Sequence, residues 1–368
     1  MGEQLYMISW YWRQRLALGL AACALSTAAW SANAVAASSC KLAKVGVVPV
    51  TMDGNQPLIN ATVNGTSVHF LLDTGADSSI LSRPAATRLN LHTRKTGGLL
   101  IGLDGAAPLR RTTIDTLEMG TYRGEDIRVL VGGDNDVGAG DDVVGVLGMD
   151  FLSGHDLEFD FAHNLLNLYK PEGCDKVELA YWTDSYSVVD MDDKWPTRDA
   201  IRLVITVDGQ PLHAFVDSGA TVSLLDAKAM RRLARDTAAV GTGPEADATP
   251  GGAMRGLIGR YIPTLISMFG SVSIGDETIK NAKMRYLAYQ DGTGQLVTDR
   301  KLDDILGSNV DMILGADFLR SHRVYVAFSQ RKIYFTYAGG PVFQTKGEAM
   351  VRDRHGDGPA DPATASEQ

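Results

Sequence analysis

The chain has 368 residues, a formal net charge of −9 and no stretch in which basic residues gather. This length allows one large domain or two mid-sized domains, with enough chain to bury a core. An acidic chain with scattered charges lacks the positive surface that nucleic acids require, so we expect no nucleic-acid partner.

Residues 1–36 have the pattern of an export signal. Two arginines precede an apolar stretch, and two Ala-x-Ala cleavage sites follow it, ending at Ala34 and Ala36. The sequence Leu20-Ala-Ala-Cys23 also has the form of a lipoprotein signal, in which Cys23 would carry the lipid. We therefore expect a periplasmic or secreted protein, with membrane attachment only if Cys23 is lipidated.

Two short acidic turns repeat along the chain. Phe70-Leu-Leu-Asp-Thr-Gly-Ala76 has a counterpart in Ala214-Phe-Val-Asp-Ser-Gly-Ala220. In each copy an apolar run ends in an acid, Asp73 or Asp217, and a glycine turn follows. One such turn is weak evidence, because Asp and Gly are common between strands.

The similarity between the copies extends to both sides of the turns. A hairpin dipeptide precedes each acid, Asn64-Gly65 in the first copy and Asp208-Gly209 in the second. Further on, Val146-Leu-Gly-Met-Asp-Phe-Leu152 is echoed by Ile313-Leu-Gly-Ala-Asp-Phe-Leu319. Short apolar or alternating runs bounded by turn residues predict strands. The sequence therefore predicts an all-β protein built from two copies of one unit.

The predicted boundaries follow from this repeat. We expect a first lobe over residues 37–180, a linker over 181–200, a second lobe over 201–338 and a disordered tail over 339–368. The linker mixes charged residues with proline, and the tail is polar without an apolar period.

Two acids at equivalent strand ends favour acid–base chemistry. If the copies pack about a pseudo-two-fold axis, the turns meet and the carboxyl groups hold one proton between them. One can then take a proton from water while the other gives a proton to a carbonyl oxygen. Gly75 and Gly219 permit the tight turns, and the hydroxyls of Thr74 and Ser218 can bond to the backbone of the other copy.

The doubled motif resembles that of the aspartic peptidases. Ala76 and Ala220, which follow the glycines, are closer to the retropepsin branch than to pepsin, and the whole is similar to bacterial exported proteins with two fused retropepsin-like lobes. The resemblance implies two homologous β-barrel lobes with few short helices and a pseudo-two-fold axis. It also implies catalytic Asp73 and Asp217, endopeptidase activity on a polypeptide substrate, no cofactor or metal, and a monomer.

The resemblance further implies a cleft covered by one or two flaps. The candidate in the first lobe is Leu99–Ala106, which lacks the tyrosine of pepsin-like flaps. The candidate in the second lobe is Gly251–Gly259. The residues that we assign to these flaps are Ile101, Gly102, Leu103, Gly256 and Leu257.

Alanine at positions 76 and 220 affects the expected pH dependence. A hydroxyl there could donate to the ionised carboxylate and lower its pKa, which alanine cannot do. We therefore expect a working pH of about 5–6, less acidic than that of pepsin.

Two other functions stay open at this point. The first is a catalytically silent relative that binds peptides or assembles envelope partners in the same cleft. The second is a different hydrolase with paired carboxylates, such as a glycosidase. The stretch Asp134–Asp142 resembles a calcium loop but lacks its glycine and closing glutamate, so we expect no metal there.

Either kind of signal processing leaves Cys40 and Cys174 as a possible pair of free thiols, because Cys23 is then either removed or lipidated. Thiols usually pair in the oxidising compartments that exported proteins reach. The sequence therefore predicts a disulfide between the entry and the exit of the first lobe.

Overall fold

The computed structural model describes residues 40–135, 137, 142–192, 199–237, 248–256, 261–288 and 309–343. The predicted signal segment, Cys23, Leu257 and most of the predicted tail lie outside the described residues. None of the helices in the described ranges is long and apolar enough to cross a membrane.

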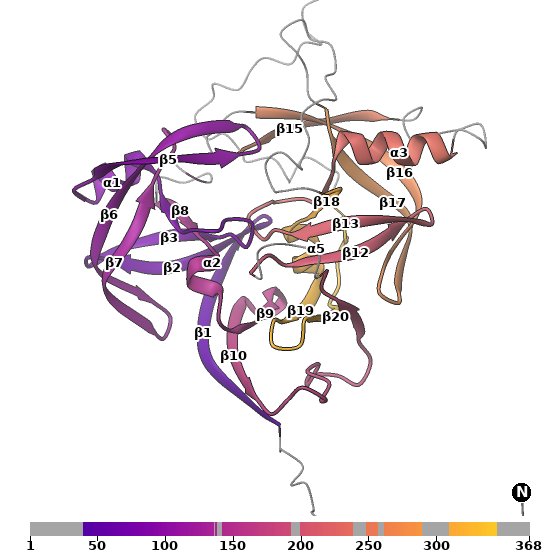
Figure 1. The fold of residues 1–368 in the computed structure, drawn as a ribbon, viewed down its shortest axis with the longest axis horizontal. Coiled ribbons are helices and arrows are strands. Elements are labelled where there is room, and N and C mark those ends of the chain that lie inside the picture. The colour runs from indigo at the N-terminus through magenta and orange to yellow at the C-terminus, as the bar shows by residue number, and fades with distance from the viewer. Residues whose placement is uncertain are drawn as a thin grey trace, which may run out of the picture. The chain divides into compact units, whose positions relative to one another are not determined.

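The described chain is mostly strand, as the sequence predicts. The elements of the first copy and the strand after it are β1 (Lys41–Asp53), β2 (Gln56–Val63), β3 (Thr66–Leu72), β4 (Ile80–Leu81), α1 (Arg83–Arg88), β5 (Arg94–Gly102), β6 (Gly105–Met119), β7 (Tyr122–Val131), β8 (Val143–Leu147), α2 (Met149–Leu152), β9 (Asp156–Asp160), the 3-10 helix η1 (Phe161–His163), β10 (Leu165–Glu172) and β11 (Ser187–Asp190). Part of the segment predicted as a linker thus forms strand β11 (Figure 1).

The second copy repeats this order. Its elements are β12 (Arg202–Val207), β13 (Gln210–Val216), β14 (Leu224–Leu225), α3 (Ala227–Thr237), β15 (Thr249–Arg255), β16 (Tyr261–Ile274), β17 (Glu277–Leu287), β18 (Met312–Leu314), α5 (Ala316–Ser321), β19 (His322–Ala327) and β20 (Lys332–Tyr337).

Local sequence explains several of these boundaries. Asn64-Gly65 and Asp208-Gly209 form the predicted hairpin turns, and all four residues have positive φ angles between 47° and 82°. Such turns match the twist of the two strands they join. Ser82 caps α1, since its side chain accepts a hydrogen bond from the Ala85 N–H at 3.0 Å.

The strand order is the same in the two copies. It is β2-β3-β8-β4-β7-β6-β5 in the first, with an added β2–β6 pairing, and β12-β13-β18-β14-β17-β16-β15 in the second, with an added β12–β16 pairing. Through the added pairing, the first strand in each order also hydrogen-bonds to the sixth. We call these two sets the first lobe and the second lobe.

A further set of strands joins the lobes. Its order is β11-β20-β19-β9-β10-β1, and β9 of the first copy pairs directly with β19 of the second. The hairpin β9–β10 and the hairpin β19–β20 therefore occupy equivalent places, and β1 and β11 flank them in the same way.

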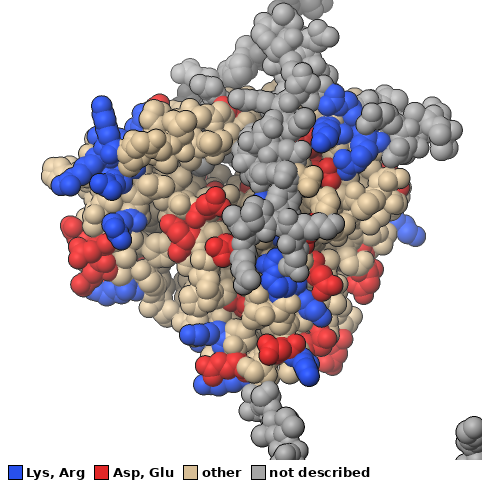
Figure 2. Space-filling view, in the orientation of Figure 1, with Lys and Arg blue, Asp and Glu red and all other residues tan. Residues whose placement is uncertain are grey.

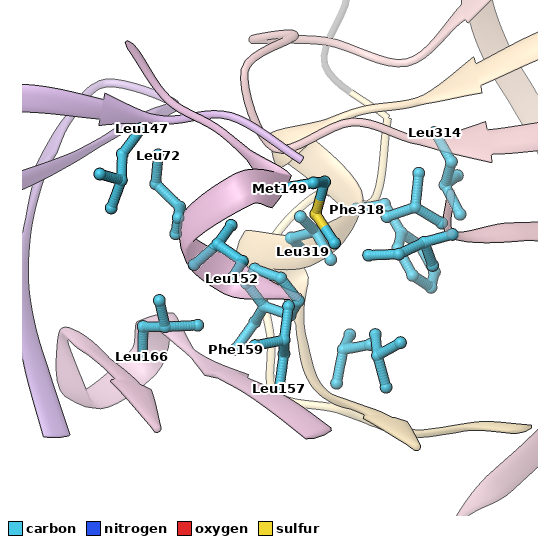
Figure 3. Close-up of a cluster of buried hydrophobic side chains, with 14 of the residues drawn as sticks. Leu72, Leu147, Met149, Leu152, Leu157, Phe159, Leu166, Leu314, Phe318 and Leu319 are labelled. Atoms are coloured by element: carbon cyan, nitrogen blue, oxygen red, sulfur yellow. The ribbon is translucent and has the colours of Figure 1, made fainter. Parts of the chain in front are cut away.

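The core runs continuously from one copy to the other. One cluster of buried side chains contains Leu72, Leu147 and Leu152 of the first copy together with Leu314 and Leu319 of the second. Figure 3 shows these side chains around the two short helices α2 and α5. Because the acids follow β3 and β13, this shared core fixes the ends of both strands.

The predicted disulfide is confirmed. Cys40 and Cys174 are bonded, with their Cα atoms 4.5 Å apart. Cys40 lies directly before β1 and Cys174 lies just after β10, so the bond closes one end of the ladder that begins at the pair Lys41 and Glu172.

Candidate active site

The two acids of the repeated turns lie at the ends of equivalent strands. The N–H of Asp73 donates to the carbonyl of Leu147 at 3.0 Å, and the N–H of Asp217 donates to the carbonyl of Leu314 at 3.0 Å. These bonds continue the parallel pairings β3–β8 and β13–β18. The echoed Leu-Gly element of each copy therefore anchors the acid of that copy.

Thr74 and Ser218 connect the two turns, as the sequence predicts. The hydroxyl of Thr74 donates to the carbonyl of Val216 at 2.9 Å and accepts from the N–H of Ser218 at 3.0 Å. Reciprocally, the hydroxyl of Ser218 donates to the carbonyl of Leu72 at 2.8 Å and accepts from the N–H of Thr74 at 3.0 Å. Both side chains are buried, so these four bonds hold the turns in one register.

Each carboxyl group packs against the glycine of the opposite turn. A Cβ placed on Gly75 would overlap the carboxyl of Asp217, and a Cβ placed on Gly219 would overlap the carboxyl of Asp73. The N–H of Gly75 donates to Asp73 at 2.9 Å and the N–H of Gly219 donates to Asp217 at 2.8 Å. The N–H of Ala220 adds a bond to Asp217 at 3.2 Å. The two acids therefore face each other at the contact between the turns.

The environment of this pair favours the protonated form. Burial, followed by the negative charge of Asp217 and the hydrogen bond between the two side chains, raises the pKa of Asp73 well above its ordinary value. Burial also raises the pKa of Asp217, against the opposing effect of hydrogen bonds from Asp73 and from the backbone of Gly219 and Ala220. These effects favour a pair that holds one proton between its two carboxyl groups.

A serine six residues after each acid supports its turn, and the sequence analysis missed this role. In the first copy, Ser79 donates to Asp150 through its N–H at 2.9 Å and its hydroxyl at 2.7 Å, and it accepts from the N–H of Gly148 at 2.9 Å. The signal was present in the sequence, because serine occurs at this place in both copies and each echoed element carries an acid.

The second copy repeats this support. Ser223 donates to Asp317 through its N–H at 2.9 Å and its hydroxyl at 2.7 Å, and it accepts from the N–H of Gly315 at 3.0 Å. Both serines are buried. The turn and the echoed element of each copy are thereby fixed to each other.

The predicted first flap is the hairpin formed by β5 and β6. Leu103 lies at its tip, half-buried against a cluster of the second lobe that also contacts Ala220. Gly102 ends β5, and Ile101 points outward with 59% of its surface exposed. Of the three residues assigned to this flap, Leu103 is the one that packs across the boundary between the lobes.

The predicted second flap corresponds to the end of β15. A Cβ placed on Gly256 would overlap the carboxyl of Asp104, which is the residue after Leu103. The described end of the second hairpin thus touches the tip of the first. This contact brings the two predicted flap segments together.

Comparison with known proteins agrees with this arrangement. A sequence model of the family described as aspartyl protease matches residues 59–151 and, separately, residues 203–318. Among solved structures, an aspartic proteinase from Irpex lacteus matches with 14% identity and a TM-score of 0.44, over 81% of this chain and 97% of that chain. A retropepsin-like aspartic protease from Rickettsia conorii matches with 24% identity and a TM-score of 0.25, over 36% of this chain and 96% of that chain. No match was found among curated proteins. The two family matches contain the two acidic turns, and the chain belongs to the aspartyl protease family.

Proposed function

We propose that this protein is an aspartic endopeptidase that hydrolyses peptide bonds with a water molecule held between Asp73 and Asp217. The observation that carries the proposal is the reciprocal packing of each carboxyl group on the glycine of the other turn. A pair in this position, with the pKa of both groups raised, has one proton to give and one site to receive a proton.

The reaction follows from that single proton. The ionised carboxylate accepts a proton from the water, whose oxygen then attacks the carbonyl carbon of the peptide bond. The protonated carboxyl donates its proton to the carbonyl oxygen, which gives a neutral tetrahedral intermediate. Collapse of this intermediate, with proton transfer to the nitrogen, breaks the C–N bond. The hydroxyls of Thr74 and Ser218 keep the two turns from separating during these steps.

We also infer export of the protein to an oxidising compartment, with cleavage near Ala34 or Ala36 or, alternatively, lipidation at Cys23. The export pattern of residues 1–36 and the bond between Cys40 and Cys174 support this inference. Sequencing the N-terminus of the protein from a native host decides between a free Ala-x-Ala product and a lipidated cysteine. An intact Met1 would contradict both.

The activity is tested on an unbiased peptide mixture from pH 3 to pH 8, with cut sites read by mass spectrometry. Asp73→Asn and Asp217→Asn are each expected to lower the cleavage rate by at least about 100-fold, since each removes one member of the acid–base pair. We expect the optimum of the parent protein at about pH 5–6, above that of pepsin.

Asp156→Asn is the matched control. Asp156 is also buried and its pKa is also raised by burial, but its carboxylate accepts hydrogen bonds from Ser329, away from the two turns. The Asp156→Asn variant is expected to cleave peptides at the same rate per folded molecule as the parent protein. If folded parent protein cuts nothing yet retains peptides, the silent binding protein replaces the peptidase as the function.

A further inference from the structure

The β5–β6 hairpin carries an apolar surface on its outer side. Leu99 and Ile101 each have 59% of their surface exposed. Their cross-strand neighbours are Pro108 and Ala106, which are exposed as well. These four residues, which we call the outer face, form two adjacent cross-strand pairs without a charged group among them.

The inner side of the same hairpin is also apolar. Leu100 and Ala107 are buried in a cluster with Ile80 and Val146, which belong to the core of the first lobe. A two-stranded ribbon that packs on one side normally presents polar side chains on the other. The inner side already supplies the apolar contacts between the hairpin and the core. Folding of the described chain therefore does not explain why the outer face is apolar.

Basic residues lie at the base of the hairpin. Arg94 pairs with Arg111 across the two strands, and Lys95 pairs with Arg110. In the part of the chain that the structure describes, no carboxylate lies within ion-pair distance of these four side chains. The one acid between positions 94 and 111 is Asp104, which is 4% exposed at the tip.

Figure 2 shows this distribution on the surface. Uncharged residues cover the region of β5, and lysines and arginines border it on one side. The hairpin therefore combines exposed aliphatic side chains with a positive charge that no acid of the described residues neutralises. Since the whole chain carries a net charge of −9, general attraction to anionic surfaces is not expected and any such attraction is local.

We propose that the outer face of the β5–β6 hairpin binds the surface of a membrane that contains anionic phospholipids. Leu99 and Ile101 would enter the boundary between headgroups and acyl chains, while Lys95 and Arg110, the cross-strand pair on the same side as Ala106 and Pro108, meet the lipid phosphates. A second copy of this chain fits less well, because symmetric contact through this face brings Lys95 and Arg110 of both copies together.

Membrane contact through this face places the two predicted flaps beside the bilayer, since Leu103 and Asp104 lie between the outer face and the second lobe. Polypeptides held at the membrane would then meet the cleft at high local concentration. The binding itself does not depend on peptidase activity, and its test uses no cleavage reaction.

The test is flotation of the protein with lipid vesicles. The chain from Ala37 is used, because the described residues from Cys40 onward form one compact unit. Vesicles of phosphatidylcholine with about 30 mol% phosphatidylglycerol are compared with pure phosphatidylcholine, at about 50 mM and about 500 mM salt. The parent protein is expected to float with the anionic vesicles at low salt, and to remain unbound with zwitterionic vesicles or at high salt.

Two double variants remove the two contributions separately. Leu99→Ser with Ile101→Ser, and Lys95→Gln with Arg110→Gln, are each expected to lower binding to anionic vesicles by about 10-fold or more. Leu99, Ile101 and Lys95 are exposed and Arg110 is half-buried. None of them lies in the core, so circular dichroism and thermal unfolding should match the parent protein.

Matched controls lie on the second lobe. Met268→Ser removes a side chain that is 51% exposed on β16, and Lys280→Gln with Lys283→Gln removes two exposed cations from β17. Both are expected to bind like the parent protein. Equal loss in these controls would overturn the proposal, as would absence of binding by the parent protein or full binding by either hairpin variant.

Two further results would assign the face to another occupant and overturn the proposal. The first is a dimer in sedimentation velocity that Leu99→Ser with Ile101→Ser converts to a monomer. The second is binding to immobilised polyglutamate, lost in both hairpin variants, by a protein that ignores vesicles.

Discussion

At the scale of single residues, the acidic turns combine close packing with dense hydrogen bonding. Neither glycine of the turns can be replaced without displacing a carboxyl group. Each acid accepts backbone N–H bonds that favour its ionised form, while burial and the facing acid favour its protonated form. The two sets of effects oppose each other, and burial is the largest for both acids. The pair is therefore costly to ionise completely.

This cost predicts how stability depends on pH. Because the pKa of Asp73 and that of Asp217 are raised, the folded protein binds protons more tightly than the unfolded chain does. The resulting stabilisation is complete below the unfolded pKa of about 4 and is lost as the pH rises through the raised folded values. Asp217→Asn, which carries no charge, should therefore raise Tm relative to the parent protein by more at pH 7 than at pH 4.

Differential scanning calorimetry across this pH range measures the effect. Asp53→Asn, on the exposed end of β1, is the control and should show no such trend. A Tm difference for Asp217→Asn that stays constant between pH 4 and pH 7 would mean that the buried pair does not govern the stability there.

At the scale of elements, local patterns predicted much of what forms the site. Asn64-Gly65 and Asp208-Gly209 require positive φ angles and became the hairpin turns. The apolar runs before Asp73 and Asp217 became β3 and β13. The support from Ser79 and Ser223 was not predicted. Serine recurs at this place in both copies, but a buried hydroxyl and its distant acceptor leave no periodic pattern that would pair them.

The disulfide permits a prediction about element pairing. Cys40 and Cys174 are separated by 134 positions, so the bond closes a long loop and restricts the unfolded chain strongly. Replacing both by serine is expected to lower the free energy of unfolding by about 2–5 kcal/mol. The slope of that free energy with urea should increase, since the unfolded chain becomes less compact.

Urea denaturation of the double variant, beside reduced and oxidised parent protein, provides the measurement. The reduced parent protein should resemble the double variant. Peptide cleavage at room temperature should persist, because the bond lies at the outer end of the β1–β10 ladder. Unchanged midpoints in all three samples would show that the ladder alone holds this end of the first lobe.

At the scale of the whole molecule, the sequence predicted the repeat but not how the copies join. The six strands between the lobes come from both copies, and β9 and β19 pair in register through Glu158 and Tyr325. Strand patterns show that a segment pairs, but they do not identify its partner, since the choice depends on contacts distant in sequence. Tyr181, at the start of the predicted linker, hydrogen-bonds to Glu158 within this junction.

A buried ion pair lies at the centre of the junction. Glu158 is fully buried in β9 of the first copy, and Arg323 in β19 of the second copy donates to it from Nε at 2.9 Å, with its Nη2 at 2.7 Å from the same carboxylate. Tyr169 and Tyr181 donate to the same carboxylate. The guanidinium also lies over the ring of Trp182, 4.9 Å from its centre. The carboxylate therefore depends on one cation from the other copy.

Removing that cation should be more harmful than removing both charges. Arg323→Met leaves Glu158 charged and buried, which is expected to lower the free energy of unfolding by about 3–5 kcal/mol. Adding Glu158→Gln should recover part of this loss, because the amide needs no counter-charge. Lys41→Met, which breaks the exposed pair with Glu172, should leave Tm unchanged. Chemical denaturation of the two single variants and the double variant measures these effects. If Arg323→Met with Glu158→Gln is as unstable as Arg323→Met alone, packing of the arginine on the aromatic rings holds the lobes together, and the ion pair does not.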